Sequence, residues 1–362
     1  MGIFVHILSS RKYMINKVKN VWKRMISNID IRTEMKKKYN CTKNNDIVII
    51  DTAINSNNLG DEIIMYYVEH GLKEMISFDQ CYHVASHSYP SEQDIEKMQQ
   101  AKYVIVCGTN ILSPQMELYS GWKFDKKMIH LDNVILVGVG WWGYKLPSMY
   151  SKFVYRNILS KTAIHSTRDE ETAAMLQSIG INNVMNTNCL TMWGLDEICR
   201  FVPNKKCDRV VFTVTAVMHD PESDKLMVRI LQEKYKELYF WPQGETDLEY
   251  LKNICDTSSI TILDRTLKAY TDLLSAENID YVGSRLHGGI HALHHNRRTI
   301  IIAVDNRAAE MSRDTNLPVI KSEEIASQLP KMIDSEWKTE ITLNRQTAEQ
   351  WKNALKERLA EG

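Results

Sequence analysis

The sequence lacks several features that define common classes of protein. It has no apolar run of transmembrane length. The apolar stretch at residues 1–8 is short for a signal peptide and has no cleavage-site pattern, so we expect a cytoplasmic protein. The seven cysteines are scattered, odd in number and without a CxxC pair. This distribution favours reduced, mostly buried thiols over a disulfide framework or a zinc site.

An excess of charge is also missing. The chain of 362 residues has 45 basic and 45 acidic side chains, so no overall positive charge favours binding to nucleic acid. No GxGxxG fingerprint, internal repeat or low-complexity tract is present. With 44% hydrophobic and 25% charged residues, the composition indicates a soluble protein whose length favours two domains.

The charge is unevenly distributed along the chain. Residues 1–40 contain ten Lys or Arg against Asp30 and Glu34, a net +8 that leaves −8 for the remainder. Within this arm, apolar residues recur at helical spacing and predict a basic amphipathic helix; they are Met14, Val18, Val21, Trp22, Met25 and Ile29. Such a helix either lies on an anionic membrane surface or packs on the body of the protein, and the sequence leaves both open.

From residue 46 onward, short β-branched segments alternate with helical patterns, which predicts parallel sheets covered by helices. The first strand set is expected at 46–51, 103–107, 134–139 and 163–166, and the second at 210–215, 238–241, 260–263, 279–282 and 299–304. Helices are expected at 61–75, 168–179, 222–235, 247–255, 267–276 and 287–295. We therefore expect two tandem Rossmann-like domains with a ligand cleft between them.

The expected boundaries follow from these patterns. They give a basic arm at 1–45, a first domain at 46–202, a second at 203–340 and a helix at 341–362. A linker is predicted around 201–208, where Pro203 and two lysines interrupt the pattern. Near the end, Thr347 and Gln350 suggest a capping box, followed by an apolar stripe of Trp351, Leu355 and Leu359. We expect this last helix to pack against the body.

The most informative segment follows the strand expected at 279–282. Arg285 and His287 lie two residues apart where a buried strand leads into a helix, and ligands bind at this edge of doubly wound sheets. Arginine holds phosphate or carboxylate groups, and histidine exchanges protons near neutral pH. The pair suits an anionic substrate that needs a proton, although Arg-x-His also occurs without any catalytic role.

Other ends of predicted strands carry candidate ligand-binding residues. Asn58, Gly60 and Asp61 follow the first strand, where the amides of a helix start can bind anionic groups, unless Asp61 is an ordinary N-cap. Asn110 follows the strand at 103–107. Trp141 and Trp142 follow a glycine-containing strand end and offer flat faces for sugar rings, with burial as the alternative.

Arg168 is expected at a strand end that begins a helix, where a cation assists anion binding, although an ion pair with Asp169 is the alternative. The pair His287 and His291 has metal-ligand spacing. It lacks an intervening Glu and a nearby ligand set, so we predict no metal and expect His291 and His294 to have packing roles.

Taken together, these segments resemble the polysaccharide pyruvyltransferase family. The matching pieces occur in the family's order over roughly residues 46–320; they are NNLGDEIIM at 57–65, VIVCGTNIL at 104–112, GVG at 138–140, STRDEETAAMLQSIGI at 166–181, SRLHGGIHAL at 284–293 and TIIIAVDNRAAEM at 299–311. The chain departs from the family pattern at Cys107–Thr109, Asn188–Leu190 and Asn296–Arg298. These departures bear more on the identity of the group that accepts pyruvate than on the binding of the pyruvate donor.

The resemblance implies a glycosyltransferase-B-like fold and transfer of pyruvate from phosphoenolpyruvate to a sugar, usually as a ketal. It implies His287 as acid/base, with Arg285, Arg168 and Arg307 holding the donor's anionic groups and Gly288 beside them. Phosphoenolpyruvate is then a co-substrate and no cofactor is needed. The acceptor would be a lipid-linked or nucleotide-linked sugar in surface polysaccharide biosynthesis, and the basic arm would suit a peripheral position on the inner face of the membrane. A nucleotide-sugar-dependent glycosyltransferase and a catalytically silent glycan-binding subunit remain as alternatives.

Overall fold

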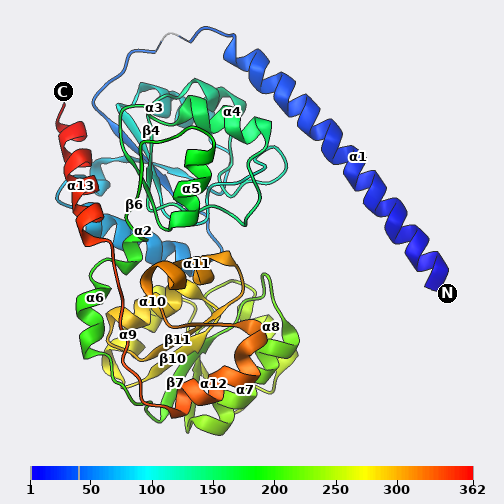
Figure 1. The fold of residues 1–362 in the computed structure, drawn as a ribbon, viewed down its shortest axis with the longest axis vertical. Coiled ribbons are helices and arrows are strands. Elements are labelled where there is room, and N and C mark those ends of the chain that lie inside the picture. The colour runs from blue at the N-terminus through cyan, green and yellow to red at the C-terminus, as the bar shows by residue number, and fades with distance from the viewer. Residues whose placement is uncertain (1, 40, 362) are drawn as a thin grey trace.

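A computed structural model describes residues 2–39 and 41–361, with side chains described from residue 16 onward. Two parallel sheets lie one above the other, each with helices on its faces (Figure 1). This arrangement confirms the expected α/β fold of two tandem Rossmann-like units. The chain also contains a long helix at its start and another at its end, α1 (Gly2–Met35) and α13 (Arg345–Ala360).

The first sheet is built from residues before 187. Its hydrogen-bonded order is β2-β1-β3-β4, and β5 and β6 form a parallel pair that continues it through the bridge between Val139 and Thr167. The strands are β1 (Ile47–Asp51), β2 (Tyr82–Ala85), β3 (Tyr103–Cys107), β4 (Val134–Val137), β5 (His165–Thr167) and β6 (Val184–Asn186). The helices of this part are α2 (Leu59–Leu72), α3 (Glu92–Gln100), α4 (Met149–Ile158), α5 (Glu170–Ser178) and α6 (Leu195–Ile198).

The second sheet has six parallel strands in the order β12-β11-β10-β7-β8-β9. They are β7 (Arg209–Thr213), β8 (Glu237–Phe240), β9 (Ile260–Ile262), β10 (Asp280–Gly283), β11 (Thr299–Ala303) and β12 (Val319–Lys321). The helices are α7 (Pro221–Lys234), α8 (Asp247–Ile254), α9 (Leu267–Ala276), α10 (Leu286–His294), α11 (Asn306–Thr315) and α12 (Ile325–Asp334). From β7 the chain adds β8 and β9 on one side, and then β10, β11 and β12 on the other side. The switch point therefore lies at the carboxyl ends of β7 and β10, where ligands of such sheets bind.

Burial on both faces of the sheet explains why most strands are apolar along their whole length. Alternate residues of the first sheet face two separate buried layers, with Val48 and Val104 on one face and Ile49 and Ile105 on the other. Strands that are buried on both faces need continuous runs of β-branched residues. Such runs were recognisable in the sequence, whereas β2 and β6 were not, because Tyr82, His83 and Asn186 interrupt the apolar pattern. Strand β12 has only three residues, too few to form a recognisable run.

Several predicted element boundaries are wrong by a few residues. The predicted capping box at Thr347 and Gln350 lies inside α13, which begins at Arg345 after the N-cap Asn344. The amide of Asn344 donates to Asn188 Oδ1 at 2.8 Å, so a tertiary contact sets the start of the helix.

The expected packing of the last helix is confirmed. Trp351 is fully buried, and its indole Nε1 donates to the Ile164 carbonyl at 2.9 Å. The helix therefore crosses back to complete the core of the first sheet (Figure 1).

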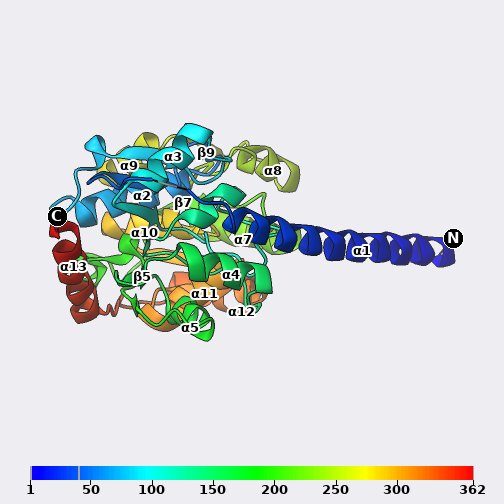
Figure 2. The same ribbon diagram turned by 90° about the horizontal axis from the view of Figure 1, so that it is seen from above.

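The described contacts of helix α1 with the body lie in its second half. Ile31 and Glu34 are buried, and the helix then projects beyond the body of the molecule (Figure 2). The side chain of Met14, part of the predicted apolar stripe, lies outside the described residues. No helix in the described part of the chain has both the length and the apolar character required to span a bilayer.

The cysteines are free thiols within the described part of the chain. Three of the seven, Cys107, Cys189 and Cys199, are buried, three are half-buried and Cys41 is exposed. The prediction of mostly buried thiols is therefore wrong in part.

Candidate active site

His287 lies at the switch point of the second sheet, in the first turn of α10. Its side chain is buried, and its Nε2 has no hydrogen-bond partner among the described residues. Burial, followed by the positive charges of Arg307 and Arg168, lowers the pKa of His287 to about 3, while Asp61 and Asp305 act in the opposite direction. The imidazole is therefore neutral at neutral pH and lies within electrostatic reach of two cations.

The first of these cations, Arg168, follows β5 and is buried. Its Nε donates to Asp169 Oδ2 at 2.8 Å, and one terminal nitrogen donates to Asn110 Oδ1 at 2.9 Å. The predicted ion pair with Asp169 is thus present. The other terminal nitrogen is buried without a partner in the described part of the chain, so the guanidinium keeps unused hydrogen-bonding capacity.

Gly140 makes room for this guanidinium. A Cβ atom at position 140 would lie only 2.2 Å from Arg168 Cζ. The arginine therefore fills the space beside the Gly140 backbone.

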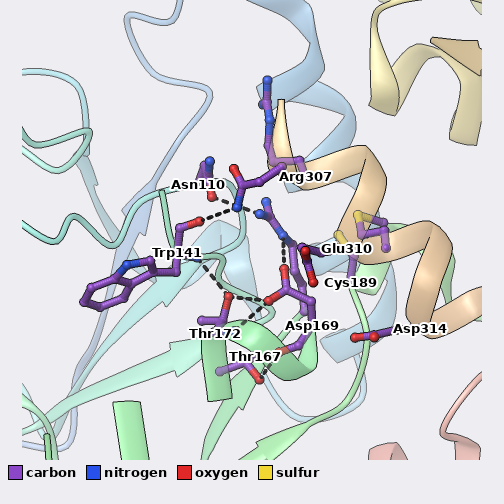
Figure 3. Close-up of polar contacts among 12 residues, drawn as sticks. Asn110, Trp141, Thr167, Asp169, Thr172, Cys189, Arg307, Glu310 and Asp314 are labelled. Atoms are coloured by element: carbon purple, nitrogen blue, oxygen red, sulfur yellow. Dashed lines mark hydrogen bonds and ion pairs between the residues drawn. The ribbon is translucent and has the colours of Figure 1, made fainter. Parts of the chain in front are cut away.

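The second cation, Arg307, approaches from the other half of the molecule at the start of α11 (Figure 3). Its Nε and one terminal nitrogen both contact Asp305 Oδ2, at 2.8 and 2.6 Å, and the side chain keeps an exposed fraction of 28%. The Asp305 carboxylate therefore neutralises it only in part, and it remains accessible to an anionic ligand.

Asp61 brings a carboxylate from the first half into the same region. It is buried, and Ser56 Oγ donates to Oδ2 at 2.6 Å while Thr109 Oγ1 donates to Oδ1 at 3.3 Å. Its charge opposes the lowering of the His287 pKa, and after Asp305 it contributes to the raised pKa of Arg307. Asp61 is therefore a member of the site and not the N-cap of α2, which is Asn58.

His87 was missed by sequence reasoning. Its Nε2 lies 3.5 Å from Asp61 Oδ2, and hydrogen bonding to that carboxylate is the largest cause of a pKa raised above 6.5. The residue follows β2, which the sequence did not predict. A strand assignment at Tyr82–Ala85 would have placed His87 at the carboxyl edge of the sheet with the other candidates.

Arg285 differs from Arg168 and Arg307 because both oxygens of a fully buried carboxylate hold its guanidinium and its side chain is only 11% exposed. Its Nε donates to Asp247 Oδ2 at 2.9 Å, and a terminal nitrogen lies 2.5 Å from Oδ1. Asp247 is fully buried and also accepts the amides of Gly244 and Ala216 at 2.7 and 3.0 Å. This geometry makes Arg285 a residue that positions the 243–247 loop, which argues against the predicted role as a donor anchor.

The start of α2 is also occupied. Asn58 Oδ1 accepts the Gly60 amide at 3.1 Å and Gln243 Nε2 at 2.7 Å, and the Leu59 amide donates to the Gln243 carbonyl at 3.0 Å. The expectation of free amides for an anion is therefore wrong. Gly60 permits close approach, since a Cβ there would lie 2.7 Å from Gln243 Nε2.

Gly288 has a similar packing role on the opposite side. A Cβ at this position would lie 2.9 Å from Gln243 Oε1, and the Gly288 carbonyl accepts the Tyr270 hydroxyl at 2.9 Å. Gly60 and Gly288 thus allow Gln243 to lie between α2 and α10, where it helps join the two halves.

The two tryptophans have different environments. Trp141 is fully buried and donates its indole Nε1 to the Lys145 carbonyl at 3.2 Å, so the expectation that it offers a face to a sugar is wrong. Trp142 is 37% exposed, with its ring centroid 4.2 Å from that of Tyr119. Only this second ring remains available to a ligand.

The other histidines of α10 have packing roles, as predicted. His291 contacts the hydroxyls of Tyr67 and Thr271 at 3.0 and 2.9 Å, and His294 Nε2 donates to the Thr191 carbonyl at 2.7 Å. Across the described residues, no group of three or more His, Cys, Asp or Glu side chains could hold a metal ion.

Comparison with known proteins identifies the family. The family model described as polysaccharide pyruvyl transferase matches residues 58–306, more than half of the chain. Searching curated protein sequences produced no significant match.

Solved structures resemble the chain only remotely. The UDP-GlcNAc 2-epimerase of Methanocaldococcus jannaschii is 11% identical, with 85% of this chain and 99% of that chain covered and a TM-score of 0.48. The UDP-GlcNAc 2-epimerase of Neisseria meningitidis is 11% identical, with 87% and 99% covered and a TM-score of 0.44. The wall teichoic acid polymerase TagF is 12% identical, with 94% and 90% covered and a TM-score of 0.37.

The family match spans both halves of the site, from Asn58 at the start of α2 to Asn306 at the start of α11. The chain belongs to the polysaccharide pyruvyl transferase family.

Proposed function

We propose that this protein transfers pyruvate from phosphoenolpyruvate to a sugar of a lipid-linked or nucleotide-linked precursor, forming a ketal during surface polysaccharide biosynthesis. The observation that carries this proposal is the environment of His287. A buried imidazole with a free Nε2 lies within electrostatic reach of Arg168 and Arg307. The donor has a phosphate, a carboxylate and a methylene carbon that must be protonated, which matches two cations and one proton carrier.

Each of these residues has its own role in the proposed reaction. Arg307 and the unused nitrogen of Arg168 bind the donor's anionic groups. His287 delivers a proton to the methylene carbon, which leaves positive charge at C2. A sugar hydroxyl attacks C2 and gives its proton to the neutral imidazole of His287. Phosphate departs with the C2–O bond electrons, a second hydroxyl closes the ketal at C2, and the released phosphate takes up that hydroxyl's proton.

His287 can act as an acid only after the donor has bound. In the free protein its pKa is lowered to about 3, because burial and the two arginines disfavour the imidazolium. The negative charges of phosphoenolpyruvate offset those arginine charges. The pKa therefore rises when the donor binds, and the site takes up a proton only with substrate present.

Binding of the donor can be tested by thermal unfolding. We expect phosphoenolpyruvate at about a hundred times its Kd to stabilise the protein by about 2.7 kcal/mol. In Gly140→Ala the new Cβ displaces the Arg168 guanidinium, and we expect at least about tenfold weaker binding. Phosphate release on addition of candidate acceptors then measures turnover.

The matched control is Gly121→Ala, because a Cβ at Gly121 meets its nearest atom at an ordinary 3.5 Å. This variant should bind phosphoenolpyruvate as the unmodified protein does. Stabilisation by nucleotide-sugars and not by phosphoenolpyruvate would contradict the proposal and favour a glycosyltransferase. Acceptor binding without turnover of either donor would indicate a silent glycan-binding subunit.

Because of His87, we expect donor binding at the proposed site to depend on pH. Its pKa is raised by Asp61, so the charged form persists above pH 6.5 and is lost as the pH rises through the raised value. Because this charge attracts the anionic donor, we expect KM for phosphoenolpyruvate to increase with pH. His87→Gln should raise KM at pH 6 by about three- to tenfold and flatten this dependence.

The control for this pH effect is His83→Gln. The pKa of His83 is also raised, principally by its hydrogen bond to Asp51, but its two ring nitrogens are held by Asp51 and the Phe78 carbonyl. KM for this variant should follow the unmodified pH profile. An unchanged profile in His87→Gln would remove His87 from the donor site.

A further inference from the structure

Helix α1 turns its apolar face away from the protein. Six side chains along it are more than half exposed, at fractions between 53% and 59%; they are Val18, Val21, Trp22, Met25, Ile26 and Ile29. At about 100° per residue these positions share one side of the helix. Large apolar residues gathered on one exposed face indicate an interaction surface.

The opposite side of the helix is the one that contacts the body. Ile31 and Glu34 are buried there, Arg24 Nε lies 3.4 Å from Glu117 Oε1, and the Lys23 amine donates to the Leu118 carbonyl at 3.4 Å. These contacts fix the rotation of the helix about its axis. The alternative that the apolar stripe packs on the body is therefore wrong for residues 18–29, whose large apolar side chains are more than half exposed.

Basic side chains border the apolar face. At about 100° per residue, Lys17 lies along one edge and Lys19 along the other, while Arg24 and Lys23 lie further round, toward the body. The first 40 residues have a net charge of +8 within an otherwise acidic chain. An apolar face with cationic borders matches the boundary between acyl chains and anionic headgroups, where the charges meet phosphate and the stripe enters the acyl region.

We propose that the face formed by Val18, Val21, Trp22, Met25, Ile26 and Ile29 docks on the surface of an anionic lipid bilayer, with α1 lying in the plane of the interface. The lysines attract the surface, and the apolar side chains then leave water. Docking does not depend on the proposed catalytic function.

Docking would also determine which part of the body faces the bilayer. Glu117 and Leu118, which contact α1, belong to the same loop as Tyr119, and Tyr119 packs against Trp142 near the candidate active site. Residues of α1 and this loop line a pocket of about 340 Å³ that includes Lys23, Ser27 and Tyr119. A lipid-linked acceptor would reach the site from this side, a step that rests on the proposed function.

Co-sedimentation of the full chain with vesicles tests the docking. We expect binding to vesicles containing about 30% phosphatidylglycerol in phosphatidylcholine, and much weaker binding to phosphatidylcholine alone. Replacing Trp22, Met25 and Ile29 together by Ser should lower the partition coefficient at least about tenfold. Lys17→Gln with Lys19→Gln should lower it about fivefold per lysine on the anionic vesicles only.

Matched controls use apolar residues outside α1 that are even more exposed. Phe201→Ser with Val217→Ser removes apolar side chains that are 76% and 66% exposed, and should leave partitioning unchanged. Thermal stabilisation by phosphoenolpyruvate should persist in every one of these variants, which separates failure of docking from failure of the catalytic proposal.

Either of two results would overturn the proposal. One is equal binding of the unmodified and triple-Ser proteins to anionic vesicles. The other is absence of vesicle binding together with a dimer in light scattering that the triple-Ser variant abolishes, since this would assign the face to a second copy of the chain. If the triple variant fails to fold, the lysine variant alone decides the question.

Discussion

Replacement of His287 by Asn is expected to lower kcat/KM for pyruvyl transfer by about 10²- to 10⁴-fold, the usual contribution of a general acid. The imidazole is buried at the switch point with its Nε2 free among the described residues, so no neighbouring group replaces its proton. Asparagine keeps a polar side chain of smaller size but cannot exchange a proton near neutral pH. Steady-state phosphate release in the presence of an acceptor measures the loss.

A control variant and a binding measurement distinguish loss of the chemical step from structural damage in His287→Asn. His295→Asn is the matched control, because His295 is the half-buried C-cap of the same helix and contacts Ser275 Oγ at 3.3 Å. It should retain activity within about twofold. Binding of phosphoenolpyruvate by His287→Asn should persist, since Arg168 and Arg307 remain. Near-normal transfer by His287→Asn would remove the residue from the mechanism.

The pH profile gives an independent check on His287. Its pKa in the free protein is lowered to about 3, so ionisation of His287 produces no change in kcat/KM near pH 6.5. The shape of the kcat/KM profile near that pH should therefore be the same in His287→Asn. The profile of kcat reports the donor complex, in which the raised pKa brings the imidazolium into the working range. We therefore expect kcat to fall as the pH rises through that bound-state value.

Asp247→Ala is expected to lower the free energy of unfolding by about 3–5 kcal/mol. The carboxylate is fully buried, and it accepts hydrogen bonds from Arg285 and from the amides of Gly244 and Ala216. Its removal leaves the Arg285 charge largely buried without its partner, which is the most costly way to break such a pair. Urea unfolding followed by circular dichroism provides the measurement.

A double-mutant cycle tests whether Arg285 works through Asp247. The effects of Asp247→Ala and Arg285→Ala should be strongly non-additive, because each removes the same interaction. Asp272→Ala breaks the exposed pair with Lys268 and should cost less than about 1 kcal/mol. Additive effects, combined with a large increase in KM for phosphoenolpyruvate in Arg285→Ala, would restore Arg285 as a donor anchor.

Some residues of the candidate site could be placed from the sequence, whereas others could not. His287 and Arg307 follow strands whose apolar residues are evident, so their place at the carboxyl edge was predictable. Arg168 follows the short strand β5, whose residues are His165, Ser166 and Thr167. His87 follows β2, whose polar residues concealed the strand, and its pairing with Asp61 joins positions 26 residues apart. Local periodicity cannot reveal such a pairing, because it depends on the order of the strands in the sheet.

The sequence by itself determined the α/β class, the family and the amphipathic character of α1, because these follow from local periodicity and from motifs in a fixed order. Only the tertiary structure decided which cations remain available: Asp247 engages Arg285, whereas Arg168 keeps a free nitrogen. Likewise, only the contacts of Ile31 and Glu34 decided that the apolar face of α1 points outward. The physical reason is the same in both cases, because the environment of a side chain depends on neighbours that are distant in the chain, and residue type and spacing do not encode them directly.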